Sequence, residues 1–177
     1  MKFLKATEAD ISGIINIIKQ AQAYFNKQRI DQWQDNYPNV ETVKSDISNE
    51  NGYVLLKDIT VVGTVVVTFD GENNYKSIYN GEWISNEKYA VIHRIAIDSN
   101  FKGLGLSSVI INYIEEMCLK KRISSIRIDT HEENISMIKL LGKNGFKYCG
   151  IIYLENKSKR IAFEKILTEG PCILTKP

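Results

Sequence analysis

The stretch HRIAIDSNFKGLGLSSVIINYIEEM, residues 93–117, joins an apolar strand pattern to a helical pattern through a glycine-containing turn. Gly103 and Gly105 stand where the chain must bend sharply, and glycine readily adopts the left-handed conformations that such bends require. A helix starting at about residue 104 would expose its first backbone N–H groups there, and such groups attract anions. The stretch therefore predicts a strand–turn–helix unit whose turn can hold a phosphate group.

Two common phosphate-binding loops do not match this turn. The P-loop pattern G-x-x-x-x-G-K-[ST] requires a lysine after its second glycine, and FKGLGLSS has none. The dinucleotide-binding pattern G-x-G-x-x-G requires a third glycine where Ser108 stands, and it normally lies early in a parallel unit. An unrelated nucleotide binder with an α/β fold nevertheless stays one alternative.

Strand and helix patterns alternate on both sides of this unit. Residues 53–58 and 60–69 read as a hairpin, and the capping-box spacing of Thr7 and Asp10 starts a helix over about residues 8–25. The other expected elements are a strand at 2–7, a short helix before 51, a short strand at Glu82 and Trp83, strands at 89–97 and 124–130, a helix at 134–144 and a hairpin at 146–155 and 159–166.

This order predicts the fold class. Hairpins mixed with crossover helices favour an α/β (α+β) fold with a mixed, mostly antiparallel sheet of six or seven strands and helices on both faces. A chain of 177 residues suits a single domain over residues 1–177, with a core ending near residue 166 and a short C-terminal tail.

Composition narrows the class of partner. The net charge of +2, from 23 basic and 21 acidic residues, gives no sign of the basic surface that binds nucleic acid. No segment approaches the roughly 20 apolar residues of a membrane span, and the N-terminus lacks the apolar core of a signal peptide. We therefore expect a soluble, cytoplasmic protein with no nucleic-acid or membrane partner.

Two spaced motifs resemble those of a known family. Residues 95–107 resemble motif A of the GNAT superfamily of acetyl-CoA-dependent N-acyltransferases, written [QR]-x-x-G-x-[GA], with Lys102 at the first position and Ser107 at the last. Residues 134–146 resemble motif B, N-x-x-A-x-x-L-Y-x-K-x-G-F, with Leu141 at the tyrosine position. The order of elements over residues 1–166 is also similar to that of the family.

The resemblance implies that acetyl-CoA binds at the turn. By that analogy, the strand edge holds the pantetheine arm, the N–H groups of residues 102–107 hold the pyrophosphate, and Asn134 bonds to the arm. A helix N-cap is the alternative role for Asn134. The residues expected to bind the cofactor are Ile95, Ala96, Ile97, Lys102, Gly103, Leu104, Gly105, Leu106, Ser107 and Asn134.

The implied activity is N-acetyl transfer to a primary amine of a small molecule or peptide, by direct transfer with general-base assistance. Such an amine has a pKa of about 10.4 and is mostly protonated at neutral pH, so a base must take a proton. His131, in the run DTHEE, is the first candidate, followed by His93 and Glu82. A strand histidine such as His93 is more often structural. The backbone N–H of Ile97 is expected to stabilise the carbonyl oxygen.

Other features leave alternatives open. Trp33, Tyr37 and Trp83 are expected to line the acceptor pocket, although an aromatic-bearing loop can equally well cover a core. The run DTHEE has no recognised metal-ligand spacing, so no metal is expected. Because Leu141 cannot act as the general acid, a catalytically weak or inactive acyl-CoA-binding and sensing module of the same fold is the alternative function. A homodimer is compatible with the resemblance, and the sequence leaves the oligomeric state open.

Overall fold

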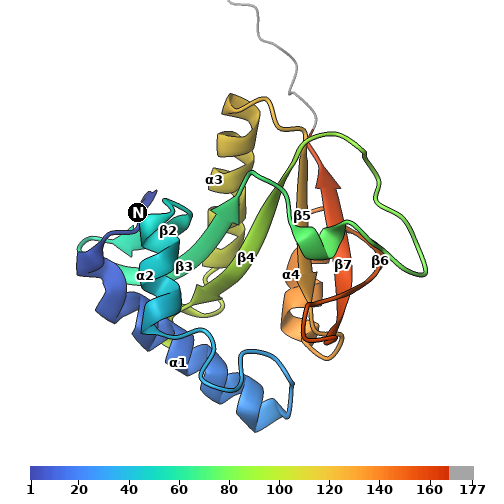
Figure 1. Cartoon of the computed structure of the whole chain (residues 1–177). Helices are drawn as coiled ribbons and strands as arrows, with labels where there is room; N and C mark the ends of the chain where they lie inside the picture. The colour runs from blue at the N-terminus through green and yellow to red at the C-terminus, as the bar shows by residue number, and fades with distance from the viewer. Residues whose placement is uncertain (168–177) are drawn as a thin grey trace, which may run out of the picture.

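The computed structural model describes residues 1–167, which form a seven-stranded sheet in the order β1-β2-β3-β4-β5-β7-β6 (Figure 1). The strands are β1 (Lys2–Lys5), β2 (Gly52–Lys57), β3 (Thr60–Thr68), β4 (Tyr89–Ile97), β5 (Ser125–Thr130), β6 (Lys147–Tyr153) and β7 (Lys159–Ile166). The α-helices are α1 (Ile11–Gln28), α2 (Val40–Ser48), α3 (Leu106–Lys120) and α4 (Ile135–Lys143). The paired strands are antiparallel except for β4 and β5, so the predicted mixed, mostly antiparallel sheet is confirmed.

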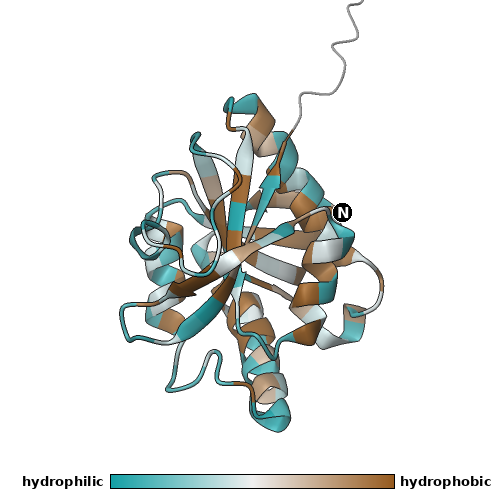
Figure 2. Cartoon of the chain, turned by 90° about the vertical axis from the view of Figure 1, so that its right-hand side faces the viewer, coloured by the Kyte–Doolittle hydropathy of each residue, from teal (hydrophilic) through white to brown (hydrophobic). Residues whose placement is uncertain are grey.

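Alternation along the strands divides the apolar residues between two faces of the sheet. In β2, Val54 belongs to a cluster with α1 and α2, whereas its neighbour Leu55 belongs to the main cluster with α3 and α4. The helices therefore cover both faces, as predicted. In Figure 2 the connecting loops are largely hydrophilic, while the strands and helices carry most hydrophobic residues.

Two local predictions need correction. Helix α3 begins at Leu106, with Gly105 as its N-cap, rather than near residue 104. The segment at Glu82 and Trp83 forms no strand, because the neighbouring N–H groups of Ile84 and Ser85 donate to the side chain of Glu164 instead of to another strand. The end of the C-terminal tail, including Cys172, lies outside the described residues.

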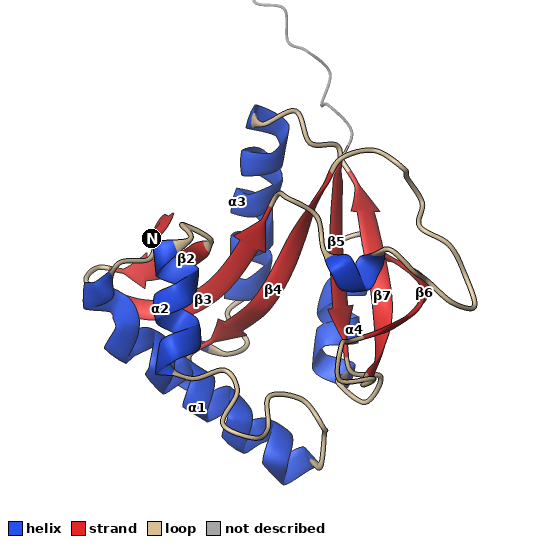
Figure 3. Ribbon diagram, viewed as in Figure 1, coloured by secondary structure: helices blue, strands red, loops and turns tan. Residues whose placement is uncertain are grey.

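Strands β4 and β5 pair only at their beginnings. Their parallel register runs from Tyr89–Ser125 to Val91–Arg127 and stops there. Beyond this point the strands diverge, as Figure 3 shows, and α1 and α4 lie on either side of the opening. The second half of β4 remains paired with β3, so its other edge is open toward the divergence.

A bulge in β4 reorients its side chains at the divergence. The register with β3 steps from Ala96 to His93 on β4 while it advances only from Thr64 to Val66 on β3. Arg94, inside the bulge, has a φ of 50°, which is uncommon for a residue other than glycine. Simple alternation predicts that His93 and Arg94 face opposite ways. The extra residue breaks that alternation, and both residues line the same cavity.

None of the helices within residues 1–167 has the length and apolar character needed to cross a membrane.

Candidate active site

Two cavities meet where β4 and β5 diverge. The polar cavity, about 560 Å³ in volume, is lined by polar and ionisable residues that include His93, Asp129 and Arg160. The turn cavity, about 470 Å³ in volume, lies along the end of β4 and the glycine turn. The residues common to both linings are Phe25, Trp33, Ile95, Asn134 and Met137.

The glycine turn presents backbone N–H groups that no protein atom uses. Among the described residues, the amides of residues 103–107 donate to no protein acceptor, whereas that of Lys102 donates to the carbonyl of Ser99 at 3.4 Å. Gly103 and Gly105 have φ values of 81° and 75°, and a Cβ at either position would meet no atom within 4 Å. Because the turn is open and precedes α3, its unbonded amides are suited to an anion, and we call residues 103–107 the anion cradle.

The side chains around the cradle differ in what they contribute. The ammonium group of Lys102 lies 4.8 Å from the ring centroid of Tyr24, at the wall of the turn cavity, and Lys143 also lines this cavity. Leu104 is 65% exposed and lies outside both linings, so its backbone N–H, and not its side chain, contributes to the cradle. Ile95, Ala96 and Ile97 line the turn cavity along the open edge of β4.

Asn134 is the N-cap of α4, which is one of the two roles that the sequence left open. Its Oδ1 atom accepts from the N–H of Met137 at 3.2 Å, which is the expected N-cap bond of α4. Its Nδ2 atom donates to Oε1 of Gln32 at 3.2 Å, and the residue lines both cavities. Asn134 therefore ties α4 to the loop that follows α1.

That loop brings aromatic residues to the cavities. Trp33 lies at the junction of the two and packs edge-on against Phe25, with 5.5 Å between the ring centroids. Tyr37 lines the polar cavity, where its hydroxyl accepts a hydrogen bond from Arg94. Arg94 also pairs with the carboxylate of Asp46 on α2.

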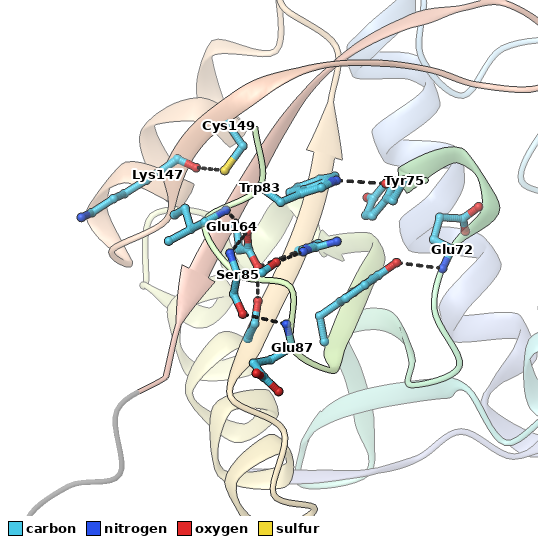
Figure 4. A network of polar contacts seen from close by, with 12 residues as sticks. Glu72, Tyr75, Trp83, Ser85, Glu87, Lys147, Cys149 and Glu164 are labelled. Carbon is cyan, nitrogen blue, oxygen red and sulfur yellow. Dashed lines mark hydrogen bonds and ion pairs between the residues drawn. The ribbon is translucent and has the colours of Figure 1, made fainter. Parts of the chain in front are cut away.

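Trp83 lies elsewhere, contrary to the prediction. Its Nε1 atom donates to the carbonyl of Tyr75 at 2.9 Å (Figure 4). The guanidinium carbon of Arg127 lies 4.1 Å from the ring centroid of Trp83. Arg127 in turn pairs with Glu164 at 3.1 Å, and both side chains are almost fully buried. Trp83 therefore holds the loop before β4 against β5 and β7, outside both cavity linings.

The polar cavity contains a carboxylate that the sequence interpretation did not select. Asp129, at the end of β5, accepts a hydrogen bond from the hydroxyl of Tyr75 at 2.7 Å through Oδ1. Among residues 1–167, Oδ2 accepts no hydrogen bond. Burial raises the pKa of Asp129, and the bond from Tyr75 and the charge of Arg160 partly offset this rise. Asp129 is part of the run DTHEE, but only the fold distinguishes it from its neighbours.

His93 lies in the same cavity beside a second carboxylate. Its Nε2 atom is 3.5 Å from Oε2 of Glu72, which belongs to the loop before β4. Burial and, secondarily, the charge of Arg94 lower the pKa of His93 from 6.5 to about 4, against the opposing effect of Glu72. The imidazole is therefore neutral at neutral pH.

The other two base candidates do not reach the cavities. His131 is outside both linings, and its Nδ1 atom accepts a hydrogen bond from the N–H of Glu133 at 3.2 Å. Glu82 is exposed on the loop before β4 and also lies outside both linings. The geometry therefore does not support a catalytic role for either residue.

The structure also explains the departure at Leu141. This side chain is fully buried in the main hydrophobic cluster, so its position on α4 faces the core. Tyr148 and Tyr153, which are 54% and 48% exposed, lie outside both linings. The tyrosine whose side chain reaches the turn cavity is Tyr24, and its hydroxyl lies 3.2 Å from Oγ of Ser136 across the opening.

The fold and the cradle agree with a comparison against protein families. A sequence profile of the Acetyltransferase (GNAT) family matches residues 17–146. This chain belongs to the GNAT acetyltransferase family. The family uses acetyl-CoA, and the unbonded amides of residues 103–107 and the open edge of β4 suit its anionic and amide groups. Membership of the GNAT family supports acyltransferase activity.

Solved structures and a curated protein are similar to this chain. A GNAT-family acetyltransferase from Streptococcus agalactiae 2603 is 32% identical with a TM-score of 0.85, over 95% of this chain and 96% of that one. The NatC complex bound to Gag peptide and CoA contains a chain with a TM-score of 0.67 at 14% identity, over 94% and 98%. The S-alkylcysteine N-acetyltransferase of Bacillus subtilis (strain 168) is 23% identical over 70% of this chain, and the match spans 64% of that relative's length.

Proposed function

We propose that this protein is an N-acetyltransferase that moves an acetyl group from acetyl-CoA to a primary amine of a small molecule or peptide. The supporting observation is that the two cavities meet at Ile95 and Asn134. One cavity has an unbonded anion cradle, and the other has a carboxylate with a free oxygen atom. A donor in the first cavity and an amine in the second would therefore approach each other at the junction.

The turn cavity would hold acetyl-CoA, which supplies an acetyl group activated as a thioester. The amides of residues 103–107 would bind the pyrophosphate, and Lys102 and Lys143 would add positive charge nearby. The backbone of residues 95–97 would bond to the amides of the pantetheine arm as an added strand does.

We propose that the acceptor amine binds to the free Oδ2 atom of Asp129. This carboxylate would bind the ammonium form of the amine. Because the pKa of Asp129 is raised, its carboxylate is a stronger base than an ordinary aspartate and accepts the proton of the amine more readily. His93, neutral in the same cavity, is the second candidate for receiving the proton. In this assignment Asp129 takes the role that the sequence gave to His131.

A thiol-release assay with acetyl-CoA and a panel of amines tests the proposal. We expect Asp129→Asn to lower kcat/KM for the acceptor by about 10²- to 10⁴-fold while the affinity for CoA changes less than about twofold. His131→Gln tests the rival assignment and should leave turnover near that of the wild type. Loss of turnover in His131→Gln together with normal turnover in Asp129→Asn would contradict the assignment.

Leu141 favours one other function. Leucine lacks the hydroxyl that many GNAT members carry at this position, which is compatible with a module that binds acyl-CoA without turnover. In an enzyme, the phenol hydroxyl of Tyr24, in the turn cavity, would be a candidate proton donor for the departing thiolate. Binding of CoA without thiol release across a broad amine panel would favour the sensing module.

A further inference from the structure

Arg160 is a buried cation that lacks a counter-ion. It lies on β7, is 9% exposed and lines the polar cavity. Its Nη1 atom donates to the carbonyl of Lys159 at 2.9 Å, and its Nη2 atom donates to the carbonyl of Asp31 at 3.4 Å. Among residues 1–167, no carboxylate forms an ion pair with Arg160.

The other two arginines that are largely buried do have carboxylate partners. Arg94 pairs with Asp46, and Arg127 pairs with Glu164. Desolvating a guanidinium is unfavourable unless an anion compensates the charge. The exception at Arg160 occurs at the wall of a cavity of about 560 Å³, where a ligand can supply that anion.

The position of Arg160 relative to Asp129 restricts the ligand. In the pairing of β5 with β7, Asp129 lies opposite Ala162, two residues from Arg160 along β7. The two charged side chains therefore stand on one face as diagonal neighbours, with Cα atoms about 7–8 Å apart. The charge of Arg160 lowers the pKa of Asp129, but the two side chains are not among the ion pairs found within residues 1–167.

We propose that the acceptor is a zwitterionic α-amino acid, whose carboxylate binds Arg160 and whose amino group binds Asp129. An amino acid carries both charges on one carbon, so it bridges neighbouring groups of opposite sign. A planar guanidinium matches a carboxylate through two parallel hydrogen bonds. The side chain of the amino acid would lie against apolar surface at Trp33 and Leu154 in the same cavity.

The inference rests on the proposed function for the binding of the amino group to Asp129. It adds that a carboxylate on the acceptor binds Arg160. We would compare acceptors that differ only in the carboxylate: methionine with methioninamide and with 3-(methylthio)propylamine, and phenylalanine with 2-phenylethylamine. Wild-type kcat/KM should be about 10- to 100-fold higher for the acid of each set, as expected for a charge-assisted contact in a buried site. This comparison needs no variant.

Variants then assign the preference to Arg160. In Arg160→Gln the advantage of the acids should largely disappear through a higher acceptor KM, while the KM for acetyl-CoA stays near the wild-type value. Loss of the Arg160 charge also raises the pKa of Asp129 and should lower kcat for every acceptor alike, so the ratio of acid to amine is the diagnostic quantity. Arg160→Lys, which keeps the charge but loses the planar fork, should retain part of the preference. Arg122→Gln, at an exposed arginine after α3, is the matched control and should behave as the wild type.

Calorimetric titration of the CoA-loaded protein with the same pairs separates failure of this inference from failure of the proposed function. Methionine that binds, and that loses its binding in Arg160→Gln, supports the inference even without turnover. Amines acetylated equally well with and without the carboxylate would overturn it and leave the proposed function standing. Equal losses for acids and amines in Arg160→Gln, or no binding and no turnover of any acid, would also overturn it.

Discussion

The hydroxyl of Tyr75 donates a hydrogen bond to Oδ1 of Asp129 at 2.7 Å, across 54 residues of sequence. Tyr75 is 2% exposed and belongs to the loop before β4, whereas Asp129 ends β5. The bond orients the carboxylate so that one oxygen is occupied by protein and the other is available to a ligand. This contact joins the loop before β4 to the polar cavity.

Tyr75→Phe should raise the pKa of Asp129 further, because the lost hydrogen bond stabilises the charged carboxylate. The acidic limb of the pH profile of kcat/KM should therefore move to higher pH. At neutral pH the acceptor kcat/KM should fall about 10-fold, as expected for a hydrogen bond to a charged group. A pH–rate series with saturating acetyl-CoA measures both effects.

Tyr148→Phe is the control for this substitution. Tyr148 is 54% exposed and packs edge-on against Phe163, outside both cavity linings. The Tyr148→Phe substitution should leave the pH profile of kcat/KM unchanged. An acidic limb in Tyr75→Phe that coincides with that of the wild type would show that Asp129 does not control the reaction.

Gly105→Ala should weaken CoA binding at least about tenfold. The new Cβ would enter the open space of the cradle, where no protein atom lies within 4 Å. The φ of 75° also costs about 1 kcal/mol for a residue with a Cβ. Isothermal titration with CoA and thermal unfolding measure the two effects separately.

Gly145→Ala is the control, because it introduces similar backbone strain at a position outside the anion cradle. Gly145 has a φ of 81° after α4, and its Cβ would contact only the flexible end of Lys165, at 3.7 Å. Both variants should lose similar stability, but only Gly105→Ala should lose affinity for CoA. Equal CoA affinities would argue against a phosphate cradle at residues 103–107.

Glu164→Gln should lower the free energy of unfolding by about 3–5 kcal/mol, because it leaves the Arg127 guanidinium buried without a counter-ion. The same carboxylate accepts the N–H groups of Ile84 and Ser85, so the loop before β4 should also loosen. Denaturant unfolding measures the loss. Glu132→Gln is the control: it breaks the exposed pair with Lys159 and should leave stability nearly unchanged. An equal loss of stability in the two variants would show that burial does not make the Arg127–Glu164 pair more important.

The lowered pKa of His93 predicts a pH-dependent contribution to stability. Between about pH 6.5 and 4 the unfolded chain binds a proton at this histidine that the folded chain does not, so stability falls as the pH falls. Relative to His93→Gln, the wild type should lose about 1–3 kcal/mol over this range. Asp129 and Asp46 have raised pKa values that act in the opposite direction, and comparing the two proteins removes their contribution. Parallel stability curves would contradict this pKa shift.

The sequence predicted the features that depend on neighbouring residues. The turn at Gly103 and Gly105, the cap at Asn134 and the strands with alternating apolar residues follow from backbone conformation and local hydrogen bonds. The spacing of these elements, together with the family resemblance, was sufficient to predict the sheet and its helices. The amides of residues 102–107 were identified for the same reason, since a helix start exposes them wherever it occurs, although the structure has that of Lys102 bonded to Ser99.

The tertiary structure alone decided which charged residues face the cavities. The bulge at Arg94 depends on the register between β3 and β4, and it overrides the alternation that the sequence indicates. Asp129 rather than His131 reaches the polar cavity, because strand register and a distant loop determine its surroundings. Arg160 carries no local signal at all. Its missing counter-ion becomes visible only when β7 lies beside β5, because burial and charge pairing are properties of the assembled sheet.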